Sequence, residues 1–219
     1  ADLASNKFII DSLHSLDSDI PILSEESFVD WRTRKNWTKY WIVDPLDGTK
    51  EFIKKNDEFT VNIALIENNR PILGIIYVPV KSVLYFAQKG FGSFTLDTKI
   101  ALNSLDEAKK IAVSKLSNQV RVIGSRSHSN NAFTNWVDEK FPNAEIIQAG
   151  SSLKFCLIAK GDADIYPRFG PTSEWDIAAG HIILNEAGGK ILTLENKEIN
   201  YNEKESVLNP EFIASSNVF

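Results

Sequence analysis

Residues 44–49 read Asp44-Pro45-Leu46-Asp47-Gly48-Thr49 and place two carboxylates three positions apart, beside a proline and a glycine. The preceding residues, Trp-Ile-Val, are typical of a β-strand, so Asp44 is expected at the C-terminal end of a strand. Pro45 directs the chain into a turn that brings Asp47 toward Asp44. Converging carboxylates repel each other unless a cation lies between them, and oxygen ligands without a thiol or an imidazole suit Mg²⁺ or Mn²⁺.

The rest of this segment adds a backbone suited to an anion. The tight turn points the Leu46 carbonyl inward as a further ligand, and Gly48 permits close approach of the backbone. The amides of Gly48 and Thr49 could then hold a phosphate, as at the start of a helix. A plainer interpretation is an acidic turn whose carboxylates cap a helix. A phosphatase of the haloacid dehalogenase type is disfavoured, because its two aspartates are separated by one residue and Asp44 and Asp47 by two.

Three other carboxylates could join this pair. Glu25 and Glu26 follow the apolar run 20–23, so one of them would project from a strand end. Asp176 lies at the start of an expected helix. By themselves, Glu25 and Glu26 are also typical of a solvated loop, and Asp176 of a helix N-cap.

These residues depend on two differently patterned halves of the chain. Up to about residue 117, one helix is expected between Leu3 and Leu16, followed mostly by strands. Apolar runs at 21–24 and 40–43 precede the runs 59–66 and 71–78, which flank a polar four-residue turn suited to a hairpin, and residues 83–87 continue the sheet. Strands in uninterrupted succession predict an antiparallel sheet.

The second half alternates between strands and helices. Its expected strands are 120–123, 144–147, 165–166 and 190–194, and its expected helices are 132–140, 152–160 and 176–187. We therefore expect an α+β subdomain at 1–117, which carries the antiparallel sheet and the metal site. An α/β subdomain at 118–219 would contribute Asp176 and the substrate specificity. No flexible linker is evident, so the halves should pack tightly.

Composition excludes several classes of protein. The chain has 219 residues, 43% of them hydrophobic, and no apolar run approaches the roughly 18 residues of a membrane span. Cys156 is the only cysteine, which rules out an internal disulfide and fits a reducing cytoplasm. A net charge of −5 argues against DNA or RNA as a partner. It does not argue against a small phosphorylated substrate, because bound metal ions invert the local charge.

Several stretches along the whole chain carry a resemblance to a known family. Leu23-Ser24-Glu25-Glu26, the segment from Trp41 through Thr49 to Ile53, and Trp175-Asp176-Ile177-Ala178-Ala179-Gly180-His181 resemble the inositol monophosphatase superfamily. Thr49-Lys50-Glu51-Phe52-Ile53, Gly150-Ser151-Ser152-Leu153-Lys154-Phe155-Cys156 and Tyr166-Pro167-Arg168-Phe169-Gly170-Pro171-Thr172 are most similar to its 3′(2′),5′-bisphosphate nucleotidase branch of the bacterial CysQ type.

The resemblance implies a layered αβαβα fold, of the α+β and α/β type seen in inositol monophosphatase and fructose-1,6-bisphosphatase. It also implies two or three bound Mg²⁺ ions, whose ligands would be Glu25, Asp44, the Leu46 carbonyl, Asp47 and Asp176. Asp2 and Thr49 would together polarise the attacking water, with Asp47 completing the catalytic set.

Substrate contacts are expected mainly in the second half. Ser151 and Ser152 open an expected helix, Lys154 lies in its first turn, and Arg168 follows an expected strand, which together make an anion site. A solvated surface lysine is the alternative for Lys154, and His128 is a weaker candidate for contact with ribose or base. The other expected substrate-binding residues are those of the metal and phosphate site, Glu25, Leu46, Asp47, Gly48, Thr49 and Asp176.

The expected activity is hydrolysis of the 3′-phosphate of 3′-phosphoadenosine 5′-phosphate to AMP, and also of its sulfated form, in sulfur assimilation and nucleotide recycling. A broader inositol or sugar phosphatase is the alternative within enzymes, and a catalytically silent nucleotide or metal sensor is the alternative outside them. The resemblance further suggests a cytoplasmic, lithium-sensitive monomer or homodimer, and peripheral association with the inner membrane. Because the chain starts at Ala1 without the helix and threonine that family members carry, we expect it to be a fragment.

Overall fold

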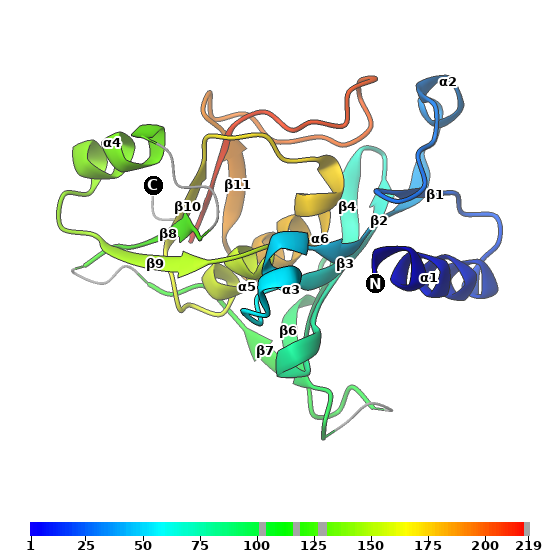
Figure 1. The fold of residues 1–219 in the computed structure, drawn as a ribbon, viewed down its shortest axis with the longest axis horizontal. Coiled ribbons are helices and arrows are strands. Elements are labelled where there is room, and N and C mark those ends of the chain that lie inside the picture. Colours follow the sequence, from blue (N-terminus) through cyan, green and yellow to red (C-terminus); the bar gives the residue numbers. More distant parts are fainter. Residues whose placement is uncertain (101–103, 116–118, 127–130, 217–219) are drawn as a thin grey trace.

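The computed structural model describes residues 1–100, 104–115, 119–126 and 131–216, and their strands form two β-sheets (Figure 1). Helices lie between the sheets and outside them. They are α1 (Asp2–Leu16), α2 (Trp31–Arg34), α3 (Thr49–Lys54), α4 (Asn131–Lys140), α5 (Leu153–Ala159) and α6 (Glu174–Glu186), with a 3₁₀ turn at Pro79–Lys81. Among the described residues, no helix is both long and apolar enough to cross a membrane.

The first sheet contains β1 to β7 in sequence order. Only β1 and β2 are parallel, so the predicted antiparallel meander is confirmed. Asn68 and Asn69 form the turn between β3 and β4 with φ values of 48° and 63°, as a two-residue type I′ hairpin requires. The strands are β1 (Ile22–Ser24), β2 (Lys39–Asp47), β3 (Thr60–Glu67), β4 (Arg70–Val78), β5 (Val83–Gln88), β6 (Gly92–Asp97) and β7 (Lys109–Ile111).

The second sheet has the order β11-β12-β10-β8-β9. β8 is parallel to β9 and β10, as expected for alternating strands and helices, whereas β12 is antiparallel to both of its neighbours. β12 lies beyond the strands that the sequence predicts, because only four residues near the chain end form it. The strands are β8 (Arg121–Ser125), β9 (Glu145–Ala149), β10 (Ile165–Arg168), β11 (Lys190–Thr193) and β12 (Phe212–Ser215).

The helices complete five layers. α1 covers the outer face of the first sheet, where Ile9 and Leu13 pack against Val43. α5 and α6 lie between the sheets, and α6 contacts β2 to β6 on one side and β11 on the other. α4 covers the outer face of the second sheet, where Val137 packs against the strands. The layered αβαβα arrangement that the sequence predicts is confirmed.

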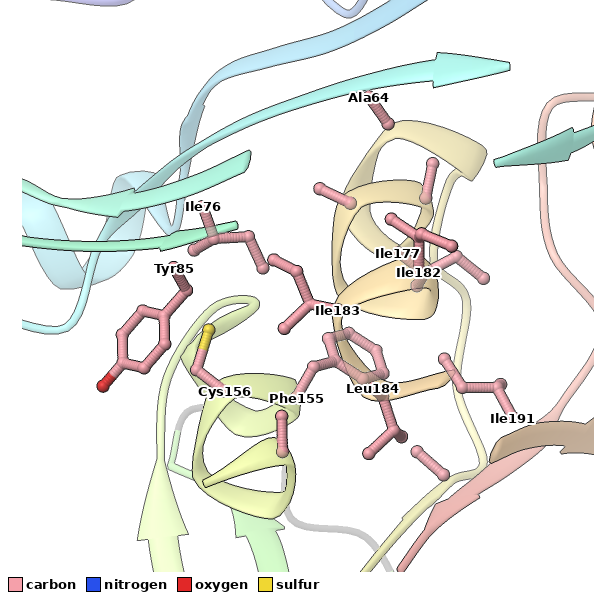
Figure 2. Close-up of a cluster of buried hydrophobic side chains, with 14 of the residues drawn as sticks. Ala64, Ile76, Tyr85, Phe155, Cys156, Ile177, Ile182, Ile183, Leu184 and Ile191 are labelled. Atoms are coloured by element: carbon pink, nitrogen blue, oxygen red, sulfur yellow. The ribbon is translucent and has the colours of Figure 1, made fainter. Parts of the chain in front are cut away.

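Close helix packing holds the two sheets together. In Figure 2, Phe155 and Cys156 of α5 face Ile183 and Leu184 of α6 within the shared core. Gly180 is required here, because a Cβ at this position would lie 2.4 Å from the Phe155 ring. Cys156 is fully buried within this core. One core cluster therefore draws side chains from both expected subdomains, and their division near residue 117 stays a prediction.

Candidate active site

The acidic segment 44–47 forms an irregular end to β2. Asp44 pairs with Asn62 and Asp47 pairs with Thr60, so β2 has one more residue than β3 between these two pairs. This is the arrangement of a β-bulge, which bends a strand and redirects its side chains. The expectation that the strand ends at Asp44 was wrong, because the bulge accommodates Pro45 and pairing resumes at Asp47.

Glu25 lies beside Asp44, which is buried, while Glu25 itself keeps an exposed face. Asp44 is 1% exposed and accepts a 3.0 Å hydrogen bond from the Leu46 amide. Glu25 follows the last residue of β1, and its amide donates to the Val43 carbonyl over 3.1 Å. Burial raises the pKa of Glu25 and raises that of Asp44 well above its usual range, and the nearby charge of Asp47 raises both further. A hydrogen bond to the Asp44 carboxyl partly counteracts the rise in the pKa of Glu25.

Asp176 approaches the same place from α6. It is the third residue of the helix, and its Oδ2 accepts a 2.8 Å hydrogen bond from the Ser173 amide in a capping box. Asp176 is thus not the N-cap, which is Ser173. Burial, and after it the charge of Asp47, raises the pKa of Asp176 to about 7. The helix start therefore fixes a carboxylate against the other acidic residues.

This set of donors fits hard divalent cations. Four carboxyl groups with raised pKa values lie in one region. Burial is the main cause for each, neighbouring charges add to it, and a bound cation would favour the ionised carboxylates. All the donors are oxygens, as Mg²⁺ prefers. Among the described residues the carboxylates do not by themselves surround one point as three ready ligands, so water and substrate oxygens must complete the coordination, which is usual for Mg²⁺.

Asp47 is held by residues of the second half of the chain. Its Oδ2 accepts a 2.5 Å hydrogen bond from the Ser152 amide, 105 residues away. Burial raises the pKa of Asp47, although the positive charge of Lys154 and the Ser152 hydrogen bond counteract this effect. The expected metal site therefore depends on α5 as well as on β2.

The predicted phosphate cradle begins a helix. α3 starts at Thr49, directly after Gly48, whose φ of +92° favours glycine. A Cβ on Gly48 would lie 3.3 Å from the Ser151 Cβ, so the segment after β2 closely approaches the start of α5. Whether the Gly48 backbone approaches a phosphate stays a prediction, and α3 lies beside α5 in Figure 1.

A cavity of about 330 Å³ joins the acidic residues to the expected anion site. Its walls include most of the predicted substrate-binding residues, namely Asp47, Gly48, Thr49, Ser151, Ser152, Lys154, Arg168 and Asp176. The walls do not include Glu25, Asp44 or Leu46. Glu25 and Asp44 lie near Asp47 in the acidic cluster, and Leu46 directly precedes Asp47 in the chain. His128 lies outside the described residues.

Asp2 lies at the edge of this site. It is the first residue of α1, and its charge contributes to the raised pKa of Glu25. Ser5 ties the helix to the acidic segment by donating a 2.9 Å hydrogen bond to the Pro45 carbonyl. The described hydrogen bonds include none between Asp2 and Thr49, so their joint action on a water molecule stays a prediction.

Lys154 is not a solvated surface lysine, and the alternative interpretation was wrong. It is 6% exposed, its Nζ donates a 2.6 Å hydrogen bond to the Ser151 carbonyl, and it lies 5.2 Å from the centroid of the Tyr166 ring. Burial lowers the pKa of Lys154 to about 8, partly offset by Asp47. Arg168 bonds to the carbonyls of Gly170 and Pro171, which orients its guanidinium at the same cavity.

Sequence reasoning missed several residues that organise the cavity. Thr60 and Asn62 are buried polar side chains of β3 that approach Asp47, and their alternation within an otherwise apolar strand was an available signal. Glu58 accepts two 2.8 Å hydrogen bonds from Arg126 and a third from the Gly150 amide. No local sequence pattern predicts the role of Glu58, because its hydrogen-bond partners are remote in sequence.

Known proteins with similar sequences and folds place these features in a family. The profile of the inositol monophosphatase family matches residues 1–217. The chain is 46% identical over 212 residues to the 3′(2′),5′-bisphosphate nucleotidase CysQ of Salmonella typhimurium, covering 97% of this chain and 82% of the relative. It is 45% identical over 215 residues to CysQ of Escherichia coli, covering 98% and 83%.

A solved structure agrees with the sequence relatives. The crystal structure of CysQ from Bacteroides thetaiotaomicron, described as a bacterial member of the inositol monophosphatase family, has a TM-score of 0.91 and 41% identity, covering 99% of this chain and 83% of that one. The predicted resemblance is confirmed across the length of the chain. This protein belongs to the inositol monophosphatase family.

Proposed function

We propose that this protein is a Mg²⁺-dependent 3′(2′),5′-bisphosphate nucleotidase that removes the 3′-phosphate of 3′-phosphoadenosine 5′-phosphate and gives AMP. The observation that carries the proposal is one cavity whose walls combine the acidic side chains of Asp47 and Asp176 with the cationic side chains of Lys154 and Arg168. A substrate with two phosphates can use both kinds of group, and the relatives that bear the nucleotidase name cover nearly the whole chain.

The carboxylates of Glu25, Asp44, Asp47 and Asp176, with the Leu46 carbonyl, would hold the metal ions. When bound, these ions lower the pKa of a bound water and neutralise charge on the phosphate and the leaving oxygen. The protein's own contribution is to hold the acidic groups together against their repulsion. Backbone hydrogen bonds from Leu46, Ser152 and Ser173 fix three of them, Asp44, Asp47 and Asp176.

The two cationic side chains, Lys154 and Arg168, position the substrate. The buried ammonium of Lys154 is fixed by the Ser151 carbonyl, and Arg168 is fixed by its own loop. Both would receive the phosphate that is not hydrolysed, in a setting where burial strengthens the attraction. The amides of Gly48 and Thr49 would hold the phosphate that is hydrolysed.

The reaction needs no covalent enzyme intermediate. Asp2 and Thr49 would orient a water, its oxygen forms the new bond to phosphorus, and the bond from phosphorus to the 3′-oxygen breaks. One proton of the water is transferred to the 3′-oxygen, so the products are a 3′-hydroxyl and inorganic phosphate. Positioning and charge neutralisation are the main contributions to phosphoryl transfer of this kind. Cys156 is not a nucleophile, because it is fully buried and burial raises the pKa of its thiol.

Phosphate release in the presence of Mg²⁺ tests this function. The substrates compared are 3′-phosphoadenosine 5′-phosphate, inositol 1-phosphate and fructose 1,6-bisphosphate. The adenosine bisphosphate should be hydrolysed fastest, and the sulfated nucleotide should also be a substrate. Equal rates on the three compounds would point to a broad phosphatase, and no release from any of them to a sensor; either result would overturn the proposal.

Asp47→Asn supplies the matching variant. The asparagine can still accept the Ser152 hydrogen bond, so the fold should remain while turnover is lost. Asp11→Asn is the control, because Asp11 is an exposed partner of Lys7 on the outer helix α1. Normal turnover by Asp47→Asn would remove Asp47 from the reaction.

A further inference from the structure

The Oδ2 oxygen of Asp47 lies at the end of a buried chain of hydrogen bonds. Thr60 and Asn62 of β3 and Ser152, which precedes α5, are each no more than 1% exposed. The Ser152 Oγ lies 2.7 Å from the Thr60 Oγ1 and 2.6 Å from the Asn62 Oδ1. The Asn62 Nδ2 lies 3.4 Å from the Asp47 Oδ2, on the same oxygen that accepts the Ser152 amide at 2.5 Å.

The chemistry of these groups assigns each proton. An amide oxygen only accepts, so the single hydroxyl proton of Ser152 points to Asn62. Thr60 then donates to the Ser152 hydroxyl over the short 2.7 Å contact, and its hydroxyl also lies 3.5 Å from the Asp47 Oδ2. Turning the Asn62 amide over would set its oxygen against the Asp47 carboxylate, so its nitrogen faces Asp47. The direction of donation is therefore from Thr60 to Ser152, to Asn62 and finally to Asp47.

We propose that Thr60, Asn62 and Ser152 are positioning residues that hold Asp47 by Oδ2 and leave its other carboxylate oxygen for a metal ion. The inference rests on the metal site of the proposed function. In this role the Ser152 side chain does not contact the substrate as the sequence predicted, because its only hydroxyl proton is donated to Asn62. Hydrogen bonds to the ligands of a metal site restrict their orientation and commonly change metal affinity about 10–100-fold when they are lost.

The arrangement also explains why β3 carries polar residues in a buried sheet. The buried side chains of Thr60, Asn62 and Ser152 find hydrogen-bond partners within this cluster, which offsets the free-energy cost of removing them from water. The hydrogen bonds cross from the first sheet to the start of α5, over 90 residues of sequence. Asp47 is thus held by residues of β3 together with the residue that precedes α5.

Metal binding without substrate is the direct test. Mn²⁺ affinity would be measured by electron paramagnetic resonance on wild type, Ser152→Ala and Ser93→Ala, and KM for the bisphosphate would be measured at saturating metal. Ser93 is the matched control, because it is a fully buried serine of β6 whose hydroxyl has no hydrogen-bond partner among the described residues. We expect Ser152→Ala to bind Mn²⁺ about tenfold more weakly with KM unchanged, and Ser93→Ala to match wild type.

A second pair of variants keeps the test decisive if Ser152→Ala folds poorly. Thr60→Ser retains the hydroxyl and should keep wild-type Mn²⁺ affinity, whereas Thr60→Val has the same shape without the hydroxyl and should lose affinity. Equal affinities for this pair would overturn the positioning chain. A raised KM for Ser152→Ala with unchanged metal affinity would instead make Ser152 a substrate contact.

The two proposals fail in different ways. Wild-type protein that binds no Mn²⁺ would refute the metal site on which both depend. Normal binding by wild type and by every variant would refute the positioning role alone.

Discussion

Asp176→Asn should stabilise the metal-free protein while it abolishes activity. A rise of the Asp176 pKa from 3.8 to about 7 means that ionising this carboxyl disfavours the fold. Since a tenfold change in an acid constant is worth about 1.4 kcal/mol, the full cost in the ionised state is about 4 kcal/mol. Asparagine removes the charge and can still accept the capping-box hydrogen bond from Ser173. The expected gain in unfolding free energy is thus up to about 4 kcal/mol.

The sign of the pH dependence follows from the same shift. Below the ordinary aspartate range, both folded and unfolded states are protonated, and the carboxyl costs nothing. As the pH rises toward about 7, the unfolded state loses its proton first, so wild type loses stability relative to the variant. Urea unfolding in EDTA, from about pH 4 to about pH 8, should show the gap opening and then levelling off.

Mg²⁺ and a second aspartate supply the controls. Saturating Mg²⁺ should stabilise wild type by about 2.7 kcal/mol at a hundred times the dissociation constant, and should stabilise Asp176→Asn less. Asp164→Asn should have the opposite sign in EDTA, a loss of about 3–5 kcal/mol, because Asp164 is a buried partner of Arg121. If Asp176→Asn were less stable than wild type at about pH 8 in EDTA, the argument that burial and the Asp47 charge disfavour the ionised Asp176 would be refuted.

Three other predictions concern single side chains. Lys154→Ala should weaken a non-hydrolysable bisphosphate inhibitor by about 1.5–3 kcal/mol in competition kinetics, whereas Lys160→Ala at the other end of α5 should not. Arg34→Ala should lower the unfolding free energy by about 3 kcal/mol in urea, because the buried guanidinium bonds to Asn202 and to two carbonyls; the exposed Arg32→Ala should change it by less than about 0.5 kcal/mol. Burial lowers the pKa of His181 to about 4, so the unfolding free energy of wild type should fall by about 3 kcal/mol as the pH drops from the usual histidine pKa to that value. Calorimetry of His181→Phe should show no such dependence of stability on pH, and equal dependence in both proteins would contradict the assignment.

Local sequence determined the parts of the site that depend on neighbouring residues. The spacing of Asp44 and Asp47, the left-handed Gly48 and the capping box that holds Asp176 are short-range properties, which turn and capping preferences specify without the rest of the fold. The antiparallel order of the first sheet was predictable for the same reason, because each strand pairs with the next along the chain.

Tertiary structure alone decided how the chemistry of those residues is tuned. Lys154 carries no local signal of burial, and it becomes a desolvated cation because α5 packs between two sheets. The Ser152 amide reaches Asp47 across 105 residues, and β3 supplies Thr60 and Asn62 to the same oxygen. Pairing and burial over such separations depend on which surfaces meet in the folded core, and neither residue type nor local spacing records that.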